Sequence, residues 1–138
     1  MTAHLIVFWF CETGGVTPPV ALVAFAASGI AKCDPNRAGF AAVRLASPLF
    51  IMPFLFAYTP LLLDGPLPNV IETVVSAAIG IIAYAGMMQG YWLRVAHVAE
   101  RVILGLGAFC LFVPNIYSDE IGLGLLAFAT AVNFKRQV

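Results

Sequence analysis

The residues best suited to chemistry gather in one short stretch near the N-terminus. Glu12-Thr13-Gly14-Gly15-Val16-Thr17-Pro18-Pro19 interrupts apolar runs over residues 5–11 and 16–31, neither long enough to span a bilayer alone. Thr17 before Pro18 predicts a helix N-cap followed by the first helical residue, with the helix running to about Ala31. The stretch therefore predicts a helix, a break and a second helix. Its composition also fits a surface loop that precedes an ordinary helix.

A break of this kind can bind an ion. Irregular backbone is tolerated at membrane depth where it lines a cavity, and broken helices of secondary transporters turn unpaired carbonyls toward a cation. Glu12 is the one ionisable group beside the break. It is therefore the candidate contact for a proton or a substrate, and an interfacial carboxylate at the tip of a hairpin is the alternative.

The elements that position this stretch are predicted to be membrane helices. The chain has 138 residues, of which 62% are hydrophobic and 10% charged, with a formal net charge of zero and a mean hydropathy of +0.96. Soluble domains are about 45–50% apolar and about 25% charged. This composition excludes a soluble enzyme and a disordered regulator, and the lack of a basic excess argues against nucleic acid as a partner.

Other reactive residue types are too scattered to form a site. Three cysteines, Cys11, Cys33 and Cys110, are an odd number and each lies in or beside an apolar run, which argues against a disulfide framework. His4 and His97 have no second ligand at helical spacing, so no metal site is predicted. Neither a catalytic triad nor a nucleotide-binding motif is present, and no enzymatic activity or catalytic residue is predicted.

The positions of the basic residues predict the topology. The stretches between the basic clusters include Asp64–Pro68 and Pro114–Glu120, which contain no Lys or Arg. Basic loops stay in the cytoplasm, so the chain is predicted to cross in, out, in, out and in, with a cytoplasmic C-terminus. The basic clusters are Lys32, Arg37 and Arg44; Arg94 and Arg101; and Lys135 and Arg136.

The uncharged runs give the predicted helices. Residues 48–63 and 73–93 are long enough to cross, whereas 102–113 and 121–134 are short and form either full crossings or a re-entrant hairpin. Asn69 and Glu72 resemble a capping box before a helix over residues 70–93. Asp34-Pro35 predicts the start of an amphipathic helix over residues 36–46 on the cytoplasmic surface, with a connecting loop as the alternative.

The fold class is accordingly an all-α, polytopic integral membrane protein. It comprises a helical hairpin arm, about four to five membrane helices and a cytoplasmic amphipathic connector. The predicted division is a hairpin arm, break and following helix over residues 1–31, the connector over 32–47, and scaffold-like C-terminal membrane helices over 48–138.

The whole chain resembles the C-terminal end of a known permease family. Residues 7–31, with Thr17-Pro18-Pro19-Val20-Ala21, look like the last hairpin and following helix of the large membrane subunit of TRAP (tripartite ATP-independent periplasmic) transporters. Asp34-Pro-Asn-Arg-Ala-Gly-Phe40, the run over residues 48–63 and the tail with Glu100-Arg101 and Ser118–Ala127 are most similar to the TAXI-type fused permeases. Such permeases are several times longer, so the resemblance implies a fragment or a split-gene product.

The resemblance implies a function and a site. It implies a secondary active transporter of the bacterial inner membrane that moves a small, anionic solute by a cation-coupled elevator mechanism. It implies a cation site at Gly14, Thr17 and Val20, with Gly15, Pro18 and Pro19 shaping the break, and either Na⁺ or H⁺ as the coupling ion. The implied partners are a periplasmic substrate-binding protein, the remainder of the permease and the lipid bilayer, with no cofactor.

A second function remains open at the level of the sequence. The chain can be a small accessory membrane subunit that stabilises a larger complex and moves nothing itself. The reading frames beside the gene would separate the two hypotheses.

Overall fold

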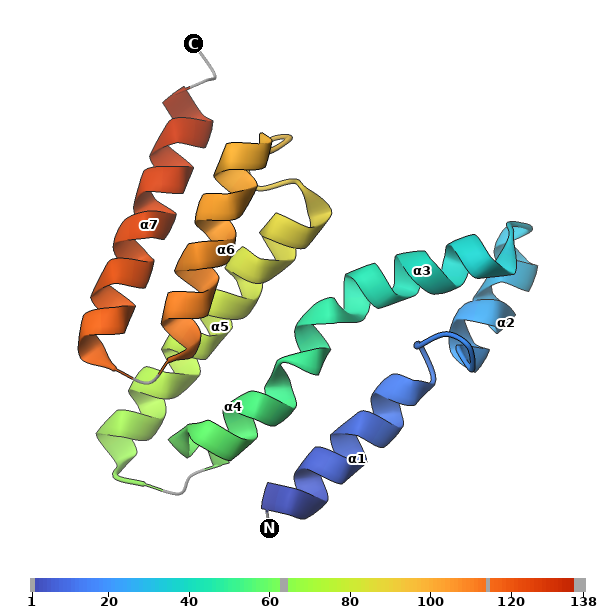
Figure 1. Cartoon of the computed structure of the whole chain (residues 1–138), viewed down its shortest axis with the longest axis horizontal. Helices are drawn as coiled ribbons and strands as arrows, with labels where there is room; N and C mark the ends of the chain where they lie inside the picture. Colours follow the sequence, from blue (N-terminus) through green and yellow to red (C-terminus); the bar gives the residue numbers. More distant parts are fainter. Residues whose placement is uncertain (1, 63–64, 114, 136–138) are drawn as a thin grey trace. The chain divides into compact units, whose positions relative to one another are not determined.

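The computed structural model describes residues 2–62, 65–113 and 115–135, and these form helices and short connections without a named strand. The all-α prediction is therefore confirmed. The chain divides into two compact units, Met1–Tyr58 and Thr59–Val138, and each is described by itself (Figure 1).

The first unit contains four α-helices and one 3₁₀ turn. Helix α1 packs along α4, and α2 packs against α3. The N-terminal helix is also fixed by a side-chain contact, because the indole Nε1 of Trp9 donates to the carbonyl of Leu49 at 2.8 Å. The elements are α1 (Thr2–Gly14), α2 (Leu22–Ala31), α3 (Pro35–Ala46), the 3₁₀ turn η1 (Ser47–Phe50) and α4 (Met52–Tyr58).

The start of α3 follows from four consecutive residues. Asp34 is extended, and its carboxylate accepts a hydrogen bond from the backbone N–H of Arg37 at 2.9 Å. Pro35 takes the first helical position, where its missing N–H leaves no bond unmade. The predicted helix after Asp34-Pro35 is confirmed, while its position at a cytoplasmic surface stays a prediction.

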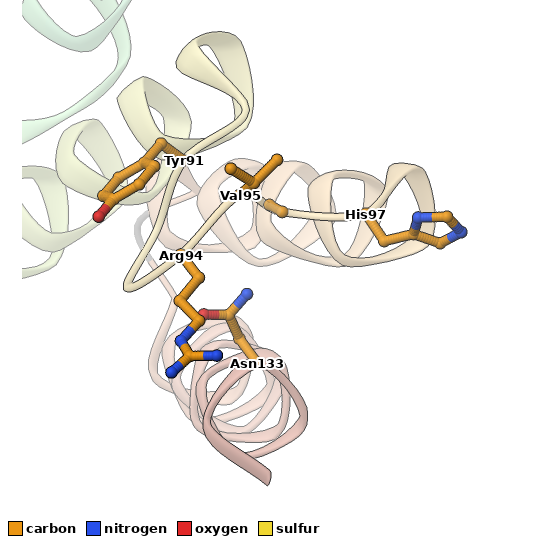
Figure 2. Close-up of a pocket in the computed structure, with 6 residues that line it drawn as sticks. Tyr91, Arg94, Val95, His97 and Asn133 are labelled. Atoms are coloured by element: carbon orange, nitrogen blue, oxygen red, sulfur yellow. The ribbon is translucent and has the colours of Figure 1, made fainter. Parts of the chain in front are cut away.

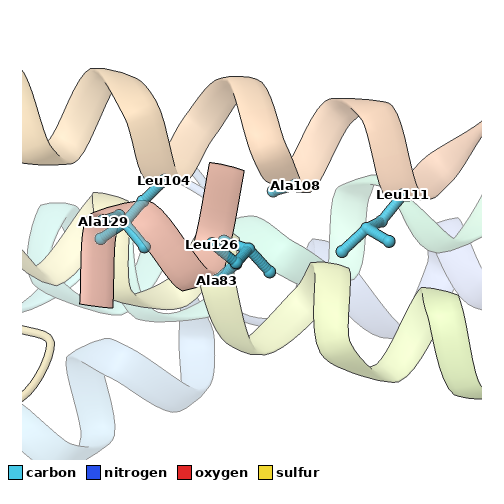
Figure 3. Close-up of a cluster of buried hydrophobic side chains, with 6 residues drawn as sticks. All are labelled: Ala83, Leu104, Ala108, Leu111, Leu126 and Ala129. Atoms are coloured by element: carbon cyan, nitrogen blue, oxygen red, sulfur yellow. The ribbon is translucent and has the colours of Figure 1, made fainter. Parts of the chain in front are cut away.

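The second unit is built on three helices, with α6 between α5 and α7 (Figure 1). Its core contains small and branched residues from all three helices (Figure 3). The core residues are Ala83, Leu104, Ala108, Leu111, Leu126 and Ala129. The elements are the 3₁₀ turn η2 (Pro60–Leu62), α5 (Leu67–Gln89), α6 (Val98–Phe112) and α7 (Ile116–Lys135).

Glycine lets α6 and α7 approach closely. A Cβ atom added at Gly122 would lie 2.8 Å from Cγ of Leu111 and 3.0 Å from the carbonyl oxygen of Gly107. Small residues at such contacts allow backbones to pack, and van der Waals packing stabilises helix pairs where lipid removes the hydrophobic driving force.

The outer faces of the helices are apolar. Ile82 on α5, Leu106 and Phe109 on α6 and Phe128 on α7 are all more than half exposed. Large apolar side chains at this density mark a surface that water does not cover. Two helical segments, Pro35–Tyr58 and Leu67–Gln89, are long and apolar enough to cross a membrane by length and composition. The larger number of crossings stays a prediction.

The predicted bounds of the long helix near residue 70 were wrong at both ends. Helix α5 begins at Leu67 after Pro66, so Asn69 lies inside its first turn and forms no capping box with Glu72. It ends at Gln89 because Gly90 adopts a φ of 70°, and the backbone then leaves the helix. A left-handed glycine is a common way to end a helix.

Candidate cation site at a break between two helices

The break between α1 and α2 lies over residues 15–21, within the interruption that the sequence predicts. Gly14 ends α1, and the Pro18–Pro19 peptide bond is cis. Proline contributes no N–H group, so Pro18 and Pro19 can only accept hydrogen bonds. The two prolines thus leave the backbone of this segment with more hydrogen-bond acceptors than hydrogen-bond donors.

Thr17 does not have the predicted role of a helix N-cap. Its carbonyl accepts a hydrogen bond from the N–H of Ala21 at 3.0 Å, which closes a single isolated turn. Ala21 then takes up left-handed backbone angles, with a φ of 34°, and α2 begins only at Leu22. The prediction that a helix starts at Thr17 was wrong because this left-handed residue separates the turn from the helix.

The hydrogen bonds across the break leave several carbonyls unused. Five carbonyls in and before the break accept a hydrogen bond from a backbone N–H further along the chain. They are those of Glu12, Thr13, Gly14, Gly15 and Thr17. Within the part of the chain that the structure describes, none of the backbone hydrogen bonds outside the helices ends on the carbonyls of Val16, Pro18, Pro19 or Val20. Backbone carbonyls without a protein partner are available to a ligand, and unwound carbonyls of this kind coordinate cations in transporters.

The Thr17 hydroxyl is held in a fixed orientation. It donates to the carbonyl of Thr13 at 2.7 Å, and the Thr13 hydroxyl donates to the carbonyl of Phe10 at 3.0 Å. Thr13 is 4% exposed and Thr17 is half-buried. Each hydroxyl donates its one proton to a backbone carbonyl. The lone pairs of the Thr17 hydroxyl oxygen therefore remain available to a ligand.

The predicted ion ligands differ in whether their carbonyl oxygens already accept a hydrogen bond. The Gly14 carbonyl accepts a long bond of 3.4 Å from the N–H of Thr17, which a closer ligand can replace. The Val20 carbonyl is one of the carbonyls without a backbone hydrogen bond, and Val20 is 57% exposed. The side chain of Glu12, in the last turn of α1, is exposed. Among the described residues, no group of three or more His, Cys, Asp or Glu could hold a metal ion.

One residue of α3, Gly39, packs against the break and was not predicted from the sequence. Gly39 is buried, and a Cβ atom there would lie 3.3 Å from Cγ of Pro18 and 3.5 Å from the ring of Phe25. A glycine inside a helix costs about 1 kcal/mol relative to alanine, so its presence in α3 was a usable signal of close approach. Gly39 thus lets α3 support the proline turn.

Comparison with known proteins finds a family match for the N-terminal segment. Residues 1–62 match the family model described as "Tripartite ATP-independent periplasmic transporter, DctM component". Over this segment the chain is similar to the membrane permease component of TRAP transporters. The resemblance to TRAP permeases is therefore confirmed for residues 1–62, whereas the TAXI type stays a prediction, and the break lies inside the matched segment. The family is one of membrane transporters, not of enzymes.

The rest of the chain matches a different model. Residues 70–130 match a domain of unknown function (DUF3394), which covers most of the second compact unit. No curated protein and no solved structure matches the chain.

Proposed function

We propose that this chain contributes a cation site to a TAXI-type TRAP permease of the bacterial inner membrane. The permease takes a small, anionic solute from a periplasmic binding protein and moves it by a cation-coupled elevator mechanism. The observation that carries the proposal is the run of unused carbonyls beside Thr17, in the segment that matches the permease family.

The chemistry of the break favours Na⁺ over H⁺ as the coupling ion. The free groups are neutral oxygens from Val16, Pro18, Pro19 and Val20, with the hydroxyl oxygen of Thr17 beside them. Unwound backbone carbonyls coordinate monovalent cations in transporters. A proton requires a group that titrates, and the nearest carboxylate along the chain, that of Glu12, is exposed.

The surface around the break supports a role inside a larger assembly. Val20, Leu22 and Val23 are 57%, 69% and 63% exposed, and Val7 and Phe8 on α1 are exposed to a similar extent. An apolar surface of this kind marks contact with protein or lipid. The remainder of the permease and the bilayer are the proposed partners of this face.

A second function is proposed for the C-terminal unit. Residues 59–138 form a compact unit with their own core, and most of them match a model other than the transporter model. This unit can therefore act as an accessory scaffold that stabilises the complex and binds no coupling ion.

The test is sodium-dependent uptake by proteoliposomes that contain the complete permease. Thr17→Val removes the hydroxyl oxygen and keeps the shape, whereas Thr17→Ser keeps the oxygen. We expect Thr17→Val to raise the sodium concentration for half-maximal uptake about tenfold, which corresponds to about 1.4 kcal/mol. We expect Thr17→Ser to change it by less than about twofold on the same scale.

Thr73→Val is the matched control. The Thr73 hydroxyl donates to the carbonyl of Asn69 at 2.8 Å, with the same four-residue spacing as the bond from Thr17 to Thr13, but it lies in α5. Sodium dependence that is unchanged in Thr17→Val, or changed equally in Thr73→Val, would remove Thr17 from the cation site. Uptake driven by a proton gradient with sodium absent would refute sodium coupling.

A further inference from the structure

The connection between α5 and α6, residues 90–97, is a folded loop with Arg94 at its tip. The N–H of Trp92 donates to the carbonyl of Arg94 at 2.9 Å, and the N–H of Ala96 donates to the carbonyl of Gly90 at 2.9 Å. Tyr91 and Val95 form an antiparallel bridge across the loop. These bonds hold the backbone of Arg94 in place.

Trp92 anchors this loop to the three-helix unit. Its indole Nε1 donates to the hydroxyl of Thr130 on α7 at 3.0 Å. Its ring lies against Gly86 on α5, where an added Cβ atom would come within 2.6 Å of the ring. In addition, the Nε of Arg101 donates to the carbonyl of Met87 at 2.8 Å. The loop therefore has a defined position on both α5 and α7.

An open pocket of about 490 Å³ lies beside the loop. In Figure 2 the side chains of Arg94 and Asn133 lie close together, whereas the ring of His97 points away from them. This volume falls in the range of about 300–1,000 Å³ that is usual for small-molecule sites. Its lining residues are Tyr91, Arg94, Val95, Ala96, His97 and Asn133.

The pocket contains a buried polar group with an unused acceptor. Asn133 is 3% exposed, and its Nδ2 donates to Oε2 of Glu100 at 2.9 Å. The same carboxylate oxygen accepts from the N–H of His97 at 3.0 Å. The Oε2 atom of Glu100 acts as the acceptor in both bonds, so the amide of Asn133 turns its nitrogen, its only donor, toward Glu100. The Oδ1 of Asn133 then has no partner among the described residues, and in Figure 2 it is drawn on the side of Arg94.

Arg94 supplies a cation beside this amide (Figure 2), and apolar residues also line the pocket. The Arg94 side chain is exposed, and neither a hydrogen bond nor an ion pair joins it to another side chain in the described part of the chain. Tyr91 and Val95, which line the pocket, are 58% and 79% exposed. A guanidinium beside apolar side chains at the end of a membrane helix suits a lipid phosphate with its acyl chains.

We propose that this pocket binds the phosphodiester headgroup of an anionic phospholipid that carries a hydroxyl group. Arg94 donates hydrogen bonds to the phosphate oxygens, and Oδ1 of Asn133 accepts one from the headgroup hydroxyl. This pairing satisfies a buried acceptor whose unpaired state costs free energy. Phosphatidylglycerol has both groups, whereas phosphatidylcholine has the phosphate but no headgroup donor.

The test is lipid binding to the full chain in detergent, followed by native mass spectrometry with phosphatidylglycerol as the probe. We expect Arg94→Gln to weaken binding about tenfold, the loss typical of one charge-assisted contact. Lys135→Gln is the matched control, because Lys135 is an exposed cation in the last turn of α7 that does not line the pocket. We expect this control to change the affinity by less than about twofold on the same scale.

Three results would overturn the proposal. An equal loss in Arg94→Gln and Lys135→Gln would mean that the lipid responds only to general surface charge. Equal affinity for phosphatidylcholine and phosphatidylglycerol would remove Asn133 from the site. Displacement of the lipid by inorganic phosphate at millimolar concentration would identify a site for the free anion instead. None of these measurements depends on transport, so the outcome is independent of the cation site.

Discussion

Substitution of Gly122 tests directly whether α6 and α7 pack closely. Replacing it with alanine adds a Cβ atom 2.8 Å from Cγ of Leu111 and 3.0 Å from the backbone oxygen of Gly107. The leucine side chain can rotate, but the backbone oxygen moves only if the helices separate. Overpacking of this kind costs about 1–3 kcal/mol. This cost is partly offset by a gain in stability of up to about 1 kcal/mol, because alanine has a higher helix propensity than glycine.

Gly124→Ala isolates the packing cost. Gly124 lies two residues further along α7, and an added Cβ atom there meets nothing within 4 Å. The gain in helix propensity is the same at both positions, so it cancels in the comparison. We expect Gly122→Ala to be less stable than Gly124→Ala by about 1–3 kcal/mol.

The assay is reversible unfolding of the chain in mixed micelles by increasing sodium dodecyl sulfate, followed by far-ultraviolet circular dichroism. Gly124→Ala should equal or exceed the stability of the unaltered chain, and Gly122→Ala should unfold at a lower fraction of dodecyl sulfate. Equal midpoints for the two variants would refute the close approach of α6 and α7.

Two further predictions concern the permease segment and the topology. Gly39→Val should reduce the apparent sodium affinity of uptake by the complete permease severalfold, because its side chain displaces Pro18; Gly29→Val, where an added Cβ atom meets nothing within 4 Å, should leave it unchanged. In a chain without native cysteines, Lys135→Cys should react with a membrane-impermeant thiol reagent only from the cytoplasmic side and Asn115→Cys only from the opposite side. The reverse labelling pattern would contradict the inferred orientation.

Local signals predicted the parts of the fold that depend on a few neighbouring residues. The start of α3 needed only an Asp34 cap, Pro35 and the next turn, and it lies where the sequence places it. The position of the break was likewise predictable from Gly14, Gly15 and the two prolines. The start of α2 was not, because the left-handed backbone at Ala21 has no local sequence signal.

The features that could not be predicted from the sequence depend on contacts between residues far apart in the chain. His97 and Glu100 form a capping box at the start of α6, and the Glu100 carboxylate also accepts a hydrogen bond from Asn133, 33 residues away along the chain. Asn133 is a lone amide near the end of an apolar run, so nothing beside it in the sequence indicates this role. The end of α5 follows from Gly90, but the fold of the following loop depends on Trp92 reaching α7.

Equilibrium binding of sodium to the purified permease, measured by titration calorimetry, tests the cation site most directly. We expect saturable binding that Thr17→Val weakens about tenfold and Thr17→Ser preserves, because the ion contacts the side-chain oxygen at this position. Binding of equal strength in the permease and in Thr17→Val would contradict it, and so would the absence of sodium binding to a permease that still transports its solute.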